Sequence, residues 1–454
     1  IFRLMAHEHF HVAGVAGVGM SAVAQALLDT GHVVTGSDRY HDEGHPLDVL
    51  DILAAAGVKM VPQDGSALTS KTAGLVVSTA IEKDNPEIAA AGRLGVPVIH
   101  RAEMIARLAK DRHVVAVTGT SGKTTVTGMI GHLLTEVGWD PFVVNGGSVL
   151  NWMGPGRLGS VRRGRSGLWI VEADESDKSL LRFNPEWAVI TNISKDHFEL
   201  AELTHLFADF AARTKNGVLC PPDVAAGLRQ LGRKDLPPLL EQEPVIQQDG
   251  GAWFFERRGL RFDVPIIGRH NAENAFMAVQ ACERLGLDLA AVRDALRTFK
   301  GIHRRLERIG QGKIAVFDDY AHNPAKIAAS WSAVAEVAPR VIGFWRPHGF
   351  APLSLMMNDL AGAFAGVFRP DDRLYILPVF YAGGTASKTV NAQDLVLQLN
   401  RLRVQSEALE GYGALRDRLL ALARPGDAIL GMGARDPELP LFARRIAEEL
   451  KQRI

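Results

Sequence analysis

The segment Gly119–Thr124 has the residue types and spacing needed to bind the phosphates of a nucleotide. It reads Gly-Thr-Ser-Gly-Lys-Thr, follows the apolar run Val114–Val117 and precedes a helix-compatible stretch that extends to about Val137. In such a strand–turn–helix unit the glycines let backbone N–H groups face phosphate oxygens, the lysine reaches the outer phosphates and the threonine hydroxyl can ligate Mg²⁺. Two residues separate the glycines here, whereas the common loop has four. An ordinary strand-to-helix turn is the alternative.

Acidic side chains follow two strands that we expect beside this loop. The apolar runs Leu168–Val171 and Trp187–Ile193 both lead into polar residues. Ligands of open α/β sheets lie at the carboxyl ends of the strands. The polar residues expected around the phosphates are Glu172, Asp174, Glu175, Asp177, Asp196 and His197. Such a set favours a magnesium site, and the alternative for any single acid is a solvated loop charge.

A second glycine-rich turn lies near the N-terminus. The strand-like run His9–Ala13 enters Gly14–Ser21, in which Gly17 and Gly19 fit the dinucleotide-loop pattern. A second expected strand ends at Asp38, at a spacing that suits a contact with a ribose hydroxyl. The glycines indicate a nucleotide without fixing which one, and NAD is the default alternative. For Asp38, the alternative is a solvated turn residue with no ligand contact.

The rest of the chain predicts hairpins and then a further α/β region. Hairpins are expected within 244–267, and a helix then begins near Gly268 with three side chains able to hydrogen-bond a base. These residues are His270, Asn271 and Asn274. Simple helix capping by Asn271 is the alternative. After Gly301, strands and helices are expected to alternate. The expected strand ends carry two histidines, His322 and His348, and this placement favours a functional role for them over a purely structural one.

Composition limits the classes of protein to which the chain can belong. Its 454 residues suffice for about three domains. The 51 basic and 51 acidic residues balance, which argues against a general nucleic-acid or membrane-surface binder. Two cysteines indicate no disulfide framework, which suits a reducing cytoplasm. We expect no membrane insertion, because Arg, Asp, Gly or Pro interrupts each candidate apolar run. We expect no signal peptide, because charged and histidine residues crowd the N-terminus.

Taken in order, these motifs resemble the Mur ligases of peptidoglycan synthesis over nearly the whole chain. The likeness is greatest to the branch of UDP-N-acetylmuramate–L-alanine ligases and murein-peptide ligases. The phosphate loop of this family also has the short spacing between its glycines. The motifs that carry the resemblance include Gly14–Ser21, Gly36–Asp38, Val76–Ile81, Asp84–Glu87, Arg101–Met104, Gly119–Thr125, Val171–Asp177, Thr191–Asn192, Asp196–His197, Gly268–Asn274, Arg304–Arg305 and Asp318–Pro324.

The resemblance implies three α/β domains: a Rossmann-like UDP-sugar-binding domain at 1–110, a P-loop ATPase-type central domain at 111–300, and a Rossmann-like domain for the amino substrate at 301–454. It also implies an ATP- and Mg²⁺-dependent ligase that activates the carboxylate of UDP-N-acetylmuramate as an acyl phosphate. An amino acid or peptide would then supply the amine. We expect no nucleic-acid partner, and a monomer or homodimer.

The same resemblance assigns residues to each task. The expected catalytic residues are Lys123, His197, Asp319 and His322. The expected ATP-binding residues are Gly119, Thr120, Ser121, Gly122, Lys123, Thr124, Thr125, Asn192, His270, Asn271, Asn274 and Arg304. The expected UDP-sugar-binding residues are Gly17, Val18, Gly19, Met20, Ser21, Ser37, Asp38, Ser78 and Thr79. The expected metal ligands are Thr124, Glu172 and His197.

One departure from the family pattern concerns the amino substrate. The alanine-adding enzymes usually carry two arginines soon after the Pro-His pair that matches Pro347-His348, and here Gly349 and Pro352 occupy those positions. An amino-acid carboxylate is best held by an arginine fork. Arg346 and Arg435 remain as candidates for it. L-alanine, another amino acid and a peptide all stay open as substrates, as does a nucleotide-binding paralogue without ligase activity.

Overall fold

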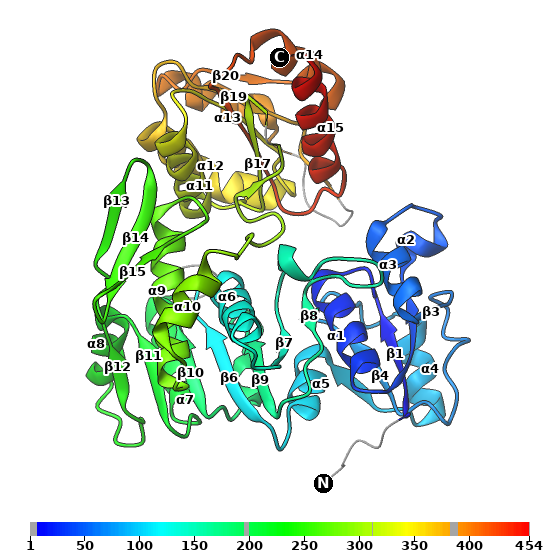
Figure 1. Ribbon diagram of the computed structural model, residues 1–454. Coiled ribbons are helices and arrows are strands. Elements are labelled where there is room, and N and C mark those ends of the chain that lie inside the picture. Colours follow the sequence, from blue (N-terminus) through cyan, green and yellow to red (C-terminus); the bar gives the residue numbers. More distant parts are fainter. Residues whose placement is uncertain (1–6, 195–198, 311, 382–388, 454) are drawn as a thin grey trace. The chain divides into compact units, whose positions relative to one another are not determined.

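The computed structural model describes residues 7–194, 199–310, 312–381 and 389–453 (Figure 1). The chain forms two compact units. The first comprises residues 1–246, 254–265 and 273–300, and the second comprises 247–253, 266–272 and 301–454. Each unit is built on parallel sheets, as the sequence predicts for an α/β protein.

The first sheet carries the N-terminal glycine turn. Within the described residues it has five strands in the order β3-β2-β1-β4-β5, and the pairs are parallel. Its strands are β1 (His9–Ala13), β2 (Val33–Ser37), β3 (Lys59–Met60), β4 (Gly74–Val77) and β5 (Val98–His100). The helices that accompany it are α1 (Val18–Asp29), α2 (Arg39–Asp42), α3 (Asp48–Ala56), α4 (Pro86–Leu94) and α5 (Arg101–Leu108).

The second sheet, in the same unit, carries the phosphate loop. Over the described ranges its order is β12-β11-β10-β6-β9-β7-β8, parallel except for the β7–β8 pair. Its strands are β6 (His113–Thr118), β7 (Phe142–Val144), β8 (Val161–Arg162), β9 (Leu168–Glu172), β10 (Trp187–Ile190), β11 (Gly217–Cys220) and β12 (Leu239–Glu241). The helical segments are α6 (Lys123–Glu136), η1 (Leu150–Trp152), η2 (Ser179–Arg182), α7 (Leu200–Ala211) and α8 (Pro222–Gln230). Central strands β6 and β9 are buried on both faces, which explains their continuous apolar sequences.

The predicted hairpins within 244–267 form a small sheet in the order β13-β14-β15. Its strands are β13 (Ile246–Asp249), β14 (Ala252–Arg257) and β15 (Leu260–Asp263), and helices α9 (Arg269–Arg284) and α10 (Leu289–Leu296) follow. The boundary between the two units passes through this sheet and through α9.

The sheet of the second unit has the order β16-β17-β21-β18-β19-β20 in the part of the chain that is described. Only its edge pair β16–β17 is antiparallel there. Its strands are β16 (Glu307–Arg308), β17 (Ala315–Asp319), β18 (Val341–Trp345), β19 (Arg373–Ile376), β20 (Ser406–Ala408) and β21 (Ala428–Met432). The helices are α11 (Pro324–Val337), α12 (Phe350–Val367), α13 (Ala392–Arg401), α14 (Tyr412–Leu422) and α15 (Glu438–Arg453).

Both faces of this last sheet bury apolar side chains. In β18, Val341 and Trp345 join one core cluster, while Ile342 and Phe344 join the other. The alternation follows from the two-residue period of a strand. Helices cover both faces in consequence, which gives the doubly wound architecture predicted for this region.

Helix α12 is, among the described residues, the helix long and apolar enough to span a membrane by length and composition, with a mean hydropathy of 1.2. Its buried residues are Leu353, Met357, Leu360, Ala361 and Phe364, which recur at the spacing of one helix face. That face packs into the core of the second unit against α11 and α13. Core helices of sheet proteins pass the same composition test.

Candidate functional site

The phosphate loop connects β6 to α6, and its two glycines have conformations that other residues rarely adopt. Gly119 has φ 129° and Gly122 has φ 80°. A Cβ on Gly119 would lie 2.1 Å from the hydroxyl of Thr191, and one on Gly122 would lie 2.4 Å from Oδ1 of Asn274. Both positions therefore require glycine, for backbone freedom and for space.

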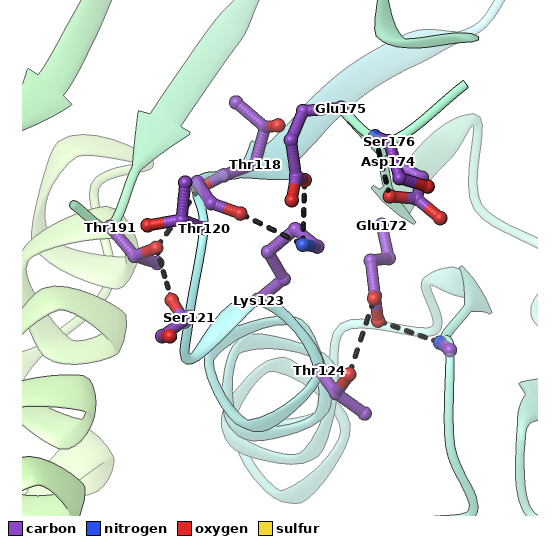
Figure 2. A network of polar contacts seen from close by, with 12 residues as sticks. Thr118, Thr120, Ser121, Lys123, Thr124, Glu172, Asp174, Glu175, Ser176 and Thr191 are labelled. Carbon is purple, nitrogen blue, oxygen red and sulfur yellow. Dashed lines mark hydrogen bonds and ion pairs between the residues drawn. The ribbon is translucent and has the colours of Figure 1, made fainter. Parts of the chain in front are cut away.

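Residues at the end of β10 brace the loop from one side. Thr191 donates its hydroxyl to the Ser121 carbonyl at 2.5 Å, as Figure 2 shows. Oδ1 of Asn192 accepts from the Thr120 hydroxyl at 2.6 Å and from the Ser121 amide at 3.1 Å. Asn192 was predicted to bind ATP, and in the structure it shapes the loop that would do so.

Lys123 begins α6 and is held between the loop and an acidic segment (Figure 2). Its Nζ donates to the Gly119 carbonyl at 2.8 Å and lies 2.6 Å from Oε2 of Glu175. Burial alone would lower the pKa of Lys123, but the carboxylates of Glu175, Asp174 and Glu172 outweigh it and raise this pKa. The ammonium therefore stays charged in a largely buried position, where its field is weakly screened.

Thr124 and Glu172 form a pair of oxygen donors beside Lys123. The Thr124 hydroxyl donates to Oε1 of Glu172 at 3.2 Å, and the Gly146 amide donates to Oε2 at 2.7 Å. A Cβ on Gly146 would lie 2.5 Å from both oxygens of that carboxylate. A hydroxyl and a carboxylate at this spacing fit Mg²⁺, which binds few protein oxygens and completes its shell with water and phosphate oxygens.

The third predicted metal ligand, His197, and the neighbouring Asp196 lie outside the described residues. Over the described residues no group of three or more His, Cys, Asp or Glu side chains is arranged to hold a metal ion. The described part of the predicted set is thus the Thr124–Glu172 pair.

Arg101, at the start of α5, links the N-terminal sheet to the acidic segment after β9. No role was predicted for this residue from the sequence. Its guanidinium lies 3.2 Å from carboxylate oxygens of both Asp174 and Asp177. A Cβ on Gly19 would lie 2.8 Å from Nη1 of Arg101. The available signal was the motif Arg101–Met104, which is one of those that carry the family resemblance.

Asp38, predicted to contact a ribose, braces the N-terminal glycine turn. It is 5% exposed, so the alternative of a solvated turn residue is wrong. Oδ2 accepts from the Ala16 amide and Oδ1 from the Tyr40 amide, each at 3.0 Å. These bonds fix the turn between β1 and α1 against the end of β2.

The other predicted UDP-sugar residues divide between exposed and buried positions. Val18 is exposed at the start of α1, whereas Met20 and Ser21 point into the fold, and Ser21 donates to the Val18 carbonyl at 2.9 Å. Ser37 is fully buried, and its hydroxyl has no hydrogen-bond partner in the described part of the chain. Gly17 and Thr79 are also exposed, whereas Gly19 and Ser78 are half-buried.

The three predicted base-binding residues fall in two units. Asn274, in the first unit, packs against Gly122 of the phosphate loop. His270 and Asn271 belong to the second unit, where Nδ2 of Asn271 donates to the Ile267 carbonyl at 2.8 Å. The structure therefore brings Asn274 to the loop, together with Asn192.

In the second unit, hydrogen bonds hold Arg304 against Asp318 and hold Asp319 against backbone amides at the end of β17. Arg304 donates from Nε to Oδ2 of Asp318 at 3.0 Å and from Nη2 to the Gly433 carbonyl at 2.6 Å. Asp319 accepts from the Leu306 and Ala321 amides, each at 2.7 Å. Burial raises the pKa of Asp319 and raises that of Asp318 to about 6.

His322 follows β17 and is held as a neutral imidazole. Its Nδ1 lies 2.9 Å from the Tyr320 carbonyl, an acceptor, so this nitrogen carries the proton and Nε2 is left as an acceptor. Burial, with the charges of Lys326, His348 and Arg305, lowers the pKa of His322 to about 4. A neutral imidazole can accept a proton or hydrogen bond from an attacking amine.

Family models and curated relatives match the chain along most of its length. The description "Mur ligase family, catalytic domain" matches residues 9–113, "Mur ligase middle domain" matches 117–207, and "Mur ligase, glutamate ligase domain" matches 304–435. A UDP-N-acetylmuramate–L-alanine ligase of Synechococcus sp. is 33% identical over 96% of this chain and 91% of its own length. One of Sinorhizobium fredii is 34% identical over 97% of both chains.

Solved structures show the same fold. A UDP-N-acetylmuramate–alanine ligase of Thermotoga maritima superposes with a TM-score of 0.80 at 24% identity, covering 98% of this chain and all of that one. A murein peptide ligase of Psychrobacter arcticus gives a TM-score of 0.65 at 20% identity, over 98% of this chain and 99% of that one. A MurF ligase of Thermotoga maritima in complex with ADP gives 0.60 at 16% identity, over 86% and 98%.

Proposed function

Because this chain belongs to the Mur ligase family, we propose that it joins an amino substrate to the carboxylate of UDP-N-acetylmuramate at the expense of ATP, forming ADP and phosphate. L-alanine is the amine we favour, since full-length relatives carry that substrate in their names. The product would be an intermediate of peptidoglycan synthesis or recycling.

The observation that carries this proposal is the geometry of the phosphate loop. Lys123 is a charged, largely buried cation next to the Thr124–Glu172 oxygen pair. A carboxylate must approach the anionic γ-phosphate of ATP, so the reaction needs positive charge at the transferring group. Lys123 supplies that charge. Thr124 and Glu172 would hold Mg²⁺, which when bound neutralises phosphate oxygens.

The chemistry proceeds in two balanced steps. The muramyl carboxylate oxygen attacks the γ-phosphorus of ATP, and the bond between that phosphorus and the oxygen bridging to the β-phosphate breaks. ADP leaves, and the muramyl carboxylate has become an acyl phosphate. The amine then attacks the acyl carbon, loses a proton, and phosphate departs with its bonding electrons. Phosphorylation is needed because a carboxylate oxygen is otherwise a poor leaving group.

Residues of the second unit would serve the second step. By family resemblance, Arg304, Asp319 and His322 act on the nucleotide and the acyl phosphate. The neutral imidazole of His322 supports a role in accepting the proton or hydrogen bond of the amine. Arg304 and Asp319 are fixed by neighbouring backbone groups, so they would present a rigid surface.

The N-terminal glycine turn would bind the uridine diphosphate part of the sugar nucleotide. Asp38 and the residues after Gly17 support this assignment because they lie at the carboxyl end of the first sheet, where nucleotides bind. A nicotinamide oxidoreductase built on this domain leaves the phosphate loop unexplained. Calorimetry with a UDP-sugar and with NAD tests which nucleotide this domain binds. We expect binding of the UDP-sugar, and preferential binding of NAD would contradict the assignment.

The direct test is phosphate release from Mg-ATP in the presence of UDP-N-acetylmuramate and each of several amines. We expect release to require both the sugar nucleotide and an amine, with L-alanine among the active amines. A murein peptide as the sole active amine would identify the chain as a peptide ligase. Nucleotide binding without release for every amine would make it a non-ligating paralogue and refute the proposal. We expect the enzyme to act in the cytoplasm as a monomer or homodimer.

A further inference from the structure

Three neighbouring strands of the second unit end at the same edge of the sheet. β21 lies between β17 and β18, and Met432 pairs with both Asp319 and Trp345. The segments that follow these strands therefore start side by side. They are 320–322, 433–435 and 346–348, and the carboxyl edge of a parallel sheet is where ligands bind.

These segments bring basic side chains together, and we call His322, His348 and Arg435 the strand-end cluster. The rings of His322 and His348 lie edge to face with centroids 5.2 Å apart. The charge of Arg435 reaches His348 and helps burial lower the pKa of that histidine. Arg435 itself is exposed.

Among the residues that the structure describes, the acidic groups next to this cluster are already engaged. Asp319 accepts from two backbone amides. Asp436, directly after Arg435, forms an ion pair with Arg346 at 2.6 Å and accepts from Tyr412. Arg435 therefore carries the positive charge of the cluster, because burial lowers the pKa values of both histidines and keeps them neutral near pH 7. An exposed guanidinium suits an anionic ligand.

Arg346 is tied into the fold and is a poor candidate for that ligand. Besides its ion pair with Asp436, its guanidinium lies 5.6 Å from the ring centroid of Phe380 and 5.2 Å from that of Tyr412. Drawing it away would leave Asp436 buried without its partner, which is costly. Arg346 thus positions Asp436 and Tyr412.

The loop after His348 also lacks the arginine fork, for a reason visible in its backbone. Gly349 has φ 89°, and its amide donates to the Phe380 carbonyl at 2.9 Å. An arginine at 349 would be strained in this conformation, and its Cβ would lie 3.3 Å from Cδ of Pro352. A carboxylate receptor must therefore come from another strand end.

We propose that Arg435, aided by His348, binds the carboxylate of the amino acid that supplies the amine. This inference rests on the proposed ligase function and names the residue that replaces the missing fork. A guanidinium pairs with a carboxylate through two parallel hydrogen bonds, and Arg435 follows the strand that lies between those of His322 and His348. The carboxylate held there would direct the neighbouring amine toward His322.

Steady-state kinetics with L-alanine and with L-alaninamide test this assignment, because the amide keeps the amine and lacks the carboxylate. For Arg435→Ala we expect the KM for L-alanine to rise about 10- to 100-fold, the range for losing a hydrogen bond to a charged group. The KM values for L-alaninamide, ATP and UDP-N-acetylmuramate should stay within about threefold of wild type. Arg435→Lys should recover part of the loss, since it keeps charge without the fork.

Charge reversal and a surface control complete the design. Arg435→Glu should make L-alaninamide the better substrate, while Arg401→Ala, an exposed arginine on α13, should leave both KM values unchanged. An unchanged ratio of the two KM values in Arg435→Ala and Arg435→Glu would overturn this inference while ligation by wild type continues. Absence of ligation by wild type with any amine would instead overturn the proposed function, and this inference with it.

Discussion

The phosphate loop of the first unit and the strand-end cluster of the second are both proposed to bind anions, and they are built in different ways. The loop draws on six consecutive residues, 119–124, and on hydrogen-bond partners from β9 and from the segment directly after β10. The cluster takes single side chains from the ends of β17, β18 and β21. The loop therefore depends on consecutive residues, whereas the cluster depends on which strand ends lie side by side.

We expect the largest loss of turnover at Lys123, because this side chain supplies the positive charge of the phosphate loop. Lys123→Ala should reduce turnover roughly 10²- to 10³-fold, because it removes a charge that stabilises the transferring phosphoryl group. Steady-state phosphate release measures this, with circular dichroism to check folding. The exposed Lys71→Ala is the matched control. Turnover of Lys123→Ala within a few-fold of wild type would refute the role of the loop.

A smaller effect is expected at His322 in the second unit. His322→Ala should lower kcat about 10- to 100-fold and leave the Kd for ATP nearly unchanged, since its proposed contact is made with the reacting amine. Comparing kcat with ATP affinity from calorimetry separates the two effects. An equal loss in both quantities would mean that the residue only supports nucleotide binding. His45→Ala, at an exposed histidine, provides the control.

At the Thr124–Glu172 pair we expect a shift in metal requirement. Glu172→Gln should raise the Mg²⁺ concentration for half-maximal activity about tenfold, because a neutral amide is a weaker ligand for a hard cation. Titration of MgCl₂ at saturating ATP measures it, with Glu202→Gln at an exposed ion pair as the control. An unchanged requirement would remove Glu172 from the metal site. The predicted ligand His197 can be tested in the same way with His197→Ala.

The smallest effect concerns acid stability and the neutral state of His322. Its pKa is lowered from 6.5 to about 4, so the unfolded chain binds this proton more readily between those values. The free energy of unfolding should therefore fall as the pH drops from about 6.5 to about 4. His322→Gln should reduce that part of the fall, as measured by denaturant unfolding at pH 7 and pH 4.5. An identical fall in both proteins would show that His322 titrates normally.

Several of the site's features were not readable from the sequence because they depend on contacts between distant segments. The pairing of Lys123 with Glu175, the link from Arg101 to Asp174 and Asp177, and the engagement of Asp38 by two amides all join residues far apart in the chain or depend on the turn geometry. The sequence indicated the acidic set as a whole. It could not say which acid would neutralise the lysine and which would face Thr124.

By itself, the sequence determined the α/β class, the order of the strands and helices along the chain, and the phosphate loop, because apolar periodicity and glycine positions encode local structure directly. Tertiary structure alone decided which strand ends lie side by side, since β21 inserts between β17 and β18 although it comes last in the chain. That insertion brings Arg435 to His348, and the left-handed backbone at Gly349 disfavours an arginine there. The physical reason is that hydrogen-bonded pairing between strands, and not distance along the chain, sets which side chains can share a ligand.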